Sequence, residues 1–137
     1  RKQALQAPKI YKPAHEIALA RIRDLAGQNL IEQGRVREFY ERLSNTLRHY
    51  IENRFSLRAP ERTTEEFLDE LKSSSVLAPD HKQELRAFLE HSDLVKFARH
   101  EPTRQQSDQS LQMAERFVEN TKSEDRLVEV GPDGQGA

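Results

Sequence analysis

Residues 35–55 read RVREFYERLSNTLRHYIENRF, and this stretch decides the fold. Its apolar side chains recur at spacings of three and four, which is the period of one face of an α-helix. At 1.5 Å per residue such a helix is about 30 Å long, enough to run the length of a small domain. The apolar stripe is wide, so we expect this helix to contact several others and to form the centre of the core. The stripe consists of Val36, Phe39, Tyr40, Leu43, Leu47, Tyr50, Ile51 and Phe55.

A two-stranded coiled coil is the competing interpretation of this stripe. Five of its eight residues follow the alternating four and three spacing of heptads. The register then meets Arg54, a charged residue at a seam position. The other three residues widen the stripe beyond a two-stranded seam. The pattern therefore favours a bundle formed within one chain.

Four further helices are predicted from the same period and from signals at their starts. Thr63 and Glu66 are spaced as a capping box, in which each side chain accepts from the backbone N–H of the other residue. Thr103 and Gln106 repeat this pattern. Pro79 suits the first turn of a helix, where its missing N–H leaves no bond unmade. The four helices span about residues 14–26, 63–72, 79–98 and 103–120.

The two ends of the chain lack the helical period. Residues 1–13 carry four Lys/Arg and two prolines, which is typical of a flexible basic tether. Residues 122–137 are predicted to form a disordered tail, and residues 14–121 to form the helical domain. No clear period-two pattern occurs, so no sheet is expected, although the apolar residues 127–130 are compatible with a short strand. The predicted fold is all-α, a compact bundle of about five helices.

Residue types that catalysis and cofactor binding need are missing or wrongly spaced. The chain has no cysteine, so it has no thiolate nucleophile or ligand. Three of its five glycines lie in the last seven positions, which leaves no glycine cluster for a phosphate-binding loop. His15-Glu16 begins like the HExxH motif of zinc peptidases, but the second histidine is replaced by Leu19. We therefore expect a non-enzyme with no cofactor and no metal site.

The charge is distributed unevenly along the chain. Residues 1–58 carry 12 Lys/Arg and 6 Asp/Glu, whereas residues 59–137 carry 10 and 17. The arginines of residues 35–55 make nucleic-acid binding the alternative function. Glutamates interrupt that basic series and the pI is only about 6.6, which argues against it. Mutual neutralisation of the two halves within the fold is the simpler interpretation.

Four motifs in the right order give the chain a resemblance to a known family. They are PAHEIALA at residues 13–20, GRVREFYERLS at 34–44, TTEEFL at 63–68 and DLVKFA at 93–98. Together they resemble the cytoplasmic C-terminal region of bacterial single-pass membrane proteins related to the BatD-type aerotolerance proteins. The resemblance covers about residues 13–120.

The resemblance implies a non-catalytic adaptor or scaffold domain on the cytoplasmic side of the bacterial inner membrane. It implies partners of two kinds, a MoxR-type AAA+ ATPase and von Willebrand factor A proteins. No apolar run here exceeds four residues, so the membrane helix is expected upstream of Arg1, in a longer protein. The basic residues of the tether fit the positive-inside rule.

The candidate partner-binding surface combines one side of the central helix with the segment around residues 93–99. Basic and aromatic side chains of this kind are common at protein interfaces. For Phe97, helical spacing favours a core position over an exposed one, because aromatic residues at such spacing usually pack inside. The candidate residues are Arg48, Arg54, Lys96, Phe97 and Arg99.

Overall fold

A computed structural model describes residues 8–57 and 62–131, in which five helices and two short strands occur. This confirms the predicted all-α bundle, apart from the small sheet. The elements in chain order are β1 (Ile10–Pro13), α1 (Ala14–Gly27), α2 (Val36–Phe55), α3 (Thr64–Ser73), α4 (Pro79–Phe97), α5 (Arg104–Thr121) and β2 (Leu127–Val130).

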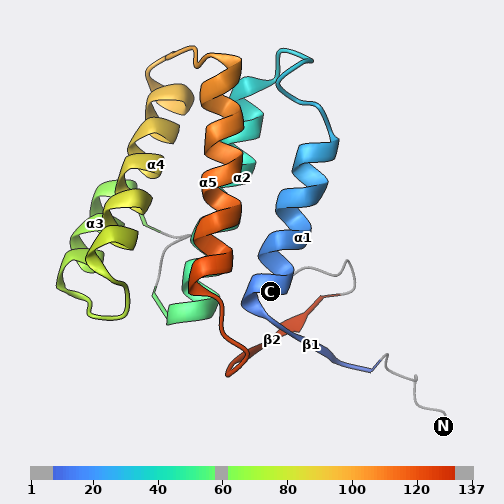
Figure 1. The fold of residues 1–137 in the computed structure, drawn as a ribbon, viewed down its shortest axis with the longest axis vertical. Helices are drawn as coiled ribbons and strands as arrows, with labels where there is room; N and C mark the ends of the chain where they lie inside the picture. Colours follow the sequence, from blue (N-terminus) through green and yellow to red (C-terminus); the bar gives the residue numbers. More distant parts are fainter. Residues whose placement is uncertain (1–7, 58–61, 132–137) are drawn as a thin grey trace, which may run out of the picture.

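Helix α2 lies in the middle of the bundle and contacts α1, α4 and α5, whereas the short α3 packs on α4. In Figure 1, α1 and α4 flank α5, and α3 lies beyond α4. Six of the eight residues of the α2 stripe are buried, and Val36 and Phe55 pack partly against the same core. The stripe is therefore covered by helices of its own chain, as predicted, and is not available as a coiled-coil seam.

The helix starts follow from local capping chemistry. Both predicted capping boxes are present, with the side chains of Thr63 and Thr103 accepting from the N–H groups of Glu66 and Gln106. Pro79 begins α4, also as predicted. None of the helices in the described part of the chain has the length and apolar content that crossing a bilayer requires.

The sheet corrects the prediction for the chain ends. Strand β1 pairs with β2 in antiparallel register, with Ile10 opposite Val130 and Pro13 opposite Leu127. Each strand has only four residues, too few to show a period, and their pairing joins segments more than 100 positions apart. Residues 127–130 are thus not part of a disordered tail. Within the predicted tether and tail, residues 1–7 and 132–137 lie outside the described residues.

Candidate functional site

The predicted surface contains a hollow where the middle of α2, the start of α3 and the end of α4 meet. Its volume is about 300 Å³. Three of the eight lining side chains are cationic and one is a carboxylate, so positive charge dominates. We call it the α2–α4 hollow, and it is lined by Asn45, Arg48, Arg62, Thr63, Thr64, Asp93, Lys96 and Phe97.

Arg48 lies at the inner side of this hollow and is only 6% exposed. One of its terminal nitrogens donates to the backbone carbonyl of Arg62 at 2.9 Å, and the other donates to the hydroxyl of Thr64. Burial lowers the pKa of Arg48, and the negative charge of Asp93 opposes that shift. Arg48 therefore links α2 to the start of α3 by hydrogen bonds.

Lys96 is a second cation in the hollow, and its side chain is half-buried. Its Nζ lies 3.6 Å from a carboxylate oxygen of Asp93 and donates to the hydroxyl of Ser44 at 3.3 Å. Burial is the main cause that lowers the pKa of Lys96, and the positive charge of Arg48 lowers it further, while Asp93 raises it. Two cations thus share the negative charge of Asp93, to which Glu41 adds a smaller contribution at Lys96, and this leaves a positive potential toward the hollow.

Phe97 is 71% exposed, so the core position favoured by its spacing is wrong. Val95 is the buried residue of this turn, and a residue two positions later lies about 200° around a helix of 3.6 residues per turn. Leu94 is exposed on the same face one turn earlier. The Lys96 ammonium lies 5.2 Å from the centroid of the Phe97 ring. The end of α4 therefore presents an apolar projection beside the positive hollow.

The structure brings together only part of the predicted residue set. Arg54 lies elsewhere, because its Nε donates to the carbonyl of Thr121 at 2.7 Å and its guanidinium stacks over Phe55. Arg99 is exposed just beyond α4 and takes a left-handed backbone conformation with φ 56°, a common way to end a helix. Asp93 begins the predicted 93–99 segment but was not among the five candidate residues, although its spacing three residues before Lys96 indicates the ion pair.

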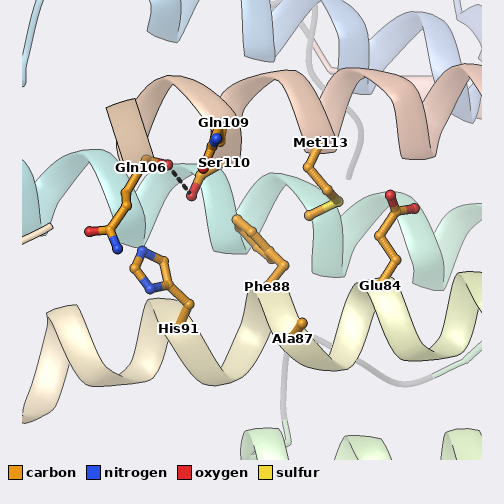
Figure 2. Close-up of a pocket in the computed structure, with 8 residues that line it drawn as sticks. All are labelled: Glu84, Ala87, Phe88, His91, Gln106, Gln109, Ser110 and Met113. Carbon is orange, nitrogen blue, oxygen red and sulfur yellow. Dashed lines mark hydrogen bonds between the residues drawn. The ribbon is translucent and has the colours of Figure 1, made fainter. Parts of the chain in front are cut away.

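A second hollow of about 320 Å³ lies between α4 and α5 (Figure 2). His91 on α4 places Nε2 3.1 Å from the hydroxyl of Tyr40, which lies 3.0 Å from that of Ser110. The Ser110 hydroxyl itself donates to the carbonyl of Gln106, the bond drawn in Figure 2. His91 thus contacts Tyr40 instead of the serine, and the arrangement does not pair a nucleophile with a base. The hollow is lined by Glu84, Ala87, Phe88, His91, Gln106, Gln109, Ser110 and Met113.

Among the described residues, one group has the donor atoms to hold a metal ion. It consists of His15 and Glu16 at the start of α1 and Glu124 between α5 and β2. The local spacing of an HExxH motif does not include Glu124, because 108 positions separate that residue from Glu16.

Comparison with known proteins does not assign this chain to a family. Searches of protein-family models, curated proteins and solved structures found no match. The resemblance of residues 13–120 to BatD-type proteins therefore enters below only as a proposal.

Proposed function

We propose that this chain is a non-catalytic protein-interaction domain that docks its partner on the α2–α4 hollow and the adjoining Leu94 and Phe97 side chains. The single observation that carries the proposal is the exposed ring of Phe97 next to two cations, the buried Arg48 and the half-buried Lys96. Leaving an aromatic ring in water forgoes the free energy of its burial, which is about 1.5–3 kcal/mol. A partner that covers the ring recovers that free energy.

The chemistry of the surface indicates what the partner presents. Interface hot spots combine aromatic and arginine side chains, which are desolvated together when the partner binds. Here the aromatic ring belongs to Phe97, and the positive potential comes from Arg48 and Lys96, which Asp93 only partly neutralises. The complementary segment carries an apolar side chain for the ring and a carboxylate for the hollow.

The resemblance to BatD-type proteins extends the proposal to a cellular location and to partners. Under it, the domain is the cytoplasmic part of a membrane-anchored bacterial protein, held at the inner membrane by an upstream helix. The partner is then a MoxR-type AAA+ ATPase or a von Willebrand factor A protein. Four Lys/Arg in residues 1–13 support this placement, because basic segments are enriched on the cytoplasmic side of membrane helices.

The nucleic-acid alternative is not favoured by any contact of α2. Arg48 and Arg54 bond to backbone carbonyls of the same chain. Arg35 and Arg42 both pair with Glu38, at 2.6 Å and 3.1 Å. A phosphate backbone is bound by arginines that project outward together. A salt titration of DNA and RNA binding tests this alternative, because the affinity of a phosphate-binding protein falls steeply as the salt concentration rises.

A site-specific crosslink tests the proposal directly. The photoreactive amino acid benzoylphenylalanine replaces Phe97, and irradiation in the native cells captures what lies against it. The matched control places the same amino acid at Tyr11, an exposed aromatic residue on β1. We expect one dominant protein adduct at position 97 that is absent at position 11.

A second variant separates docking from folding. Phe97→Ala removes an exposed ring, so the melting temperature should stay within about 2 °C of the wild type. The adduct partner should no longer co-purify with this variant. The proposal is wrong if positions 97 and 11 give the same adducts, or if Phe97→Ala still retains the captured partner.

A further inference from the structure

His15, the second residue of α1, is a buried imidazole with poor hydrogen bonding. It is 7% exposed, and its Nδ1 is buried without a hydrogen-bond partner. Its Nε2 faces Glu124 Oε1 at 3.6 Å, longer than a hydrogen bond. Burying a polar group with unsatisfied atoms is unfavourable, so most native proteins provide a partner. A ligand between His15 and Glu124 gives Nε2 the partner that it lacks, and it leaves Nδ1 as it is.

The spacing of the donor atoms fits a bound ion. One donor atom each from His15, Glu16 and Glu124 lies within 4.8 Å of the others. Around a tetrahedral ion with bonds of about 2.1 Å, neighbouring donors are about 3.4 Å apart. The 3.6 Å between His15 Nε2 and Glu124 Oε1 is close to that separation, so a small ion fits with little movement. Glu124 is exposed and closes the site by rotating its side chain.

The electrostatics also favour a cation. Glu16 and Glu124 carry two negative charges, and neither makes an ion pair with Lys or Arg among the described residues. The start of α1 opposes a cation with the equivalent of about half a positive charge. The two carboxylates outweigh this contribution.

We propose that His15, Glu16 and Glu124 bind a divalent transition-metal ion, of which zinc is the best match. One imidazole and two carboxylates are ligands that Zn²⁺ accepts at these distances, with water in the remaining position. Magnesium and calcium prefer an all-oxygen shell, so the imidazole selects against them. This inference goes beyond the proposed docking function and does not depend on it.

A metal ion bound here would connect the loop between α5 and β2 to the start of α1. Glu124 lies between the end of α5 at Thr121 and the start of β2 at Leu127. Leu127 pairs with Pro13, the residue before α1. An ion held by His15 and Glu124 therefore fixes the loop that leads β2 onto β1, and its role is structural.

The test is zinc binding by the full chain after treatment with a chelator. Isothermal titration with Zn²⁺ should show one site per chain, and Co²⁺ in its place should give the visible absorption of a bound ion. Glu124→Gln should weaken zinc binding by at least about tenfold, the smallest loss that even outer-shell substitutions cause. Glu124 is 75% exposed, so this variant keeps the fold. Zinc should also raise the melting temperature of the wild type more than that of the variant.

Two control variants make the result specific. Asp125→Asn removes the neighbouring exposed acid and should leave zinc affinity unchanged. His91→Gln removes a histidine outside the proposed site, whose ring lies 5.5 Å from that of His100, and should also leave zinc affinity unchanged. The proposal is overturned if the wild type binds no zinc, if Glu124→Gln binds it equally well, or if His91→Gln abolishes binding.

Discussion

The side-chain oxygens of Tyr50 and Thr121 lie 2.7 Å apart in the core, although 71 positions separate the two residues. The Thr121 hydroxyl donates to the carbonyl of Phe117 at 2.7 Å, so Tyr50 is the donor in the pair. Ten residues earlier on α2, the hydroxyl of Tyr40 lies 3.0 Å from that of Ser110. These two pairs fix α2 and α5 side by side in the same direction and set their register.

Removing the Tyr50 hydroxyl should destabilise the fold moderately. Tyr50→Phe keeps the ring and loses one buried hydrogen bond, so the free energy of unfolding should fall by about 1 kcal/mol. Thr121→Val should cost a similar amount, because it leaves the Tyr50 hydroxyl without its best partner. In a double-mutant cycle measured by urea unfolding, the pair of changes should cost clearly less than the sum of the two. Additive losses would contradict the bond.

The same tyrosine should make stability fall at alkaline pH. Burial raises the pKa of Tyr50 above its ordinary value of 10.0, and its hydrogen bond with Thr121 offsets part of that shift. Above pH 10 the unfolded chain therefore loses this proton before the folded chain does. The stabilising contribution is full below pH 10 and is lost as the pH rises through the folded pKa. The stability difference between wild type and Tyr50→Phe should be constant up to about pH 10 and shrink above it, and a difference that stays constant above pH 10 would refute this.

The capping box at the start of α3 should stabilise the fold and lower the pKa of Glu66. Thr63→Ala removes the acceptor for the Glu66 N–H and should cost about 1 kcal/mol of the free energy of unfolding. Hydrogen bonds from the backbone N–H and then the hydroxyl of Thr63 lower the pKa of Glu66. Its contribution is therefore full above the unfolded pKa and lost as the pH falls through the folded value. An NMR titration should show a higher Glu66 pKa in Thr63→Ala, and Thr103→Ala is the control that leaves it unchanged.

The sequence predicted those features whose cause is local. The helix starts at Thr63, Pro79 and Thr103 follow from contacts within one turn, so spacing alone places them. The burial of the α2 stripe follows from its width. Phe97 was misplaced because an apolar residue near a helix end was assigned to the core without its angle from Val95. The angular position decides burial, and it was available from the sequence.

The features that the sequence did not predict depend on contacts between distant segments. Pairing of Pro13 with Leu127 and the approach of Glu124 to His15 both require the folded bundle between them. From the sequence alone, Arg48 is expected to be a solvent-exposed helix residue. It is buried because the residues at the start of α3 approach α2 and supply the carbonyl of Arg62 and the hydroxyl of Thr64 as acceptors. Contacts of this kind carry no local signal in the sequence.

His91 should make the fold less stable in mild acid. Burial lowers its pKa below the ordinary 6.5, and the neighbouring His100 lowers it further. The unfolded chain then binds a proton at a higher pH than the folded chain, so this contribution is full above pH 6.5 and is lost as the pH falls through the folded pKa. His100→Gln removes one of the two causes, so an NMR titration should show the His91 pKa move upward. An unchanged or lower value would contradict the arrangement.

Lys96 should lower the stability of the fold and strengthen partner binding at the α2–α4 hollow. Lys96 is held there at a cost, because burial lowers the pKa of its ammonium group and Arg48 repels it. Lys96→Met keeps the length of the stem and removes the charge, while Asp93 retains Arg48 as a partner. The free energy of unfolding of this variant at pH 7 should be equal to or greater than that of the wild type. Asp93→Asn should instead lower it, because the two cations then lose the carboxylate that offsets their charge most. Lys96→Met should nonetheless weaken the partner adduct captured at Phe97, since it removes positive charge from the docking surface. A stable Asp93→Asn with an unstable Lys96→Met would mean that the two cations do not share that carboxylate.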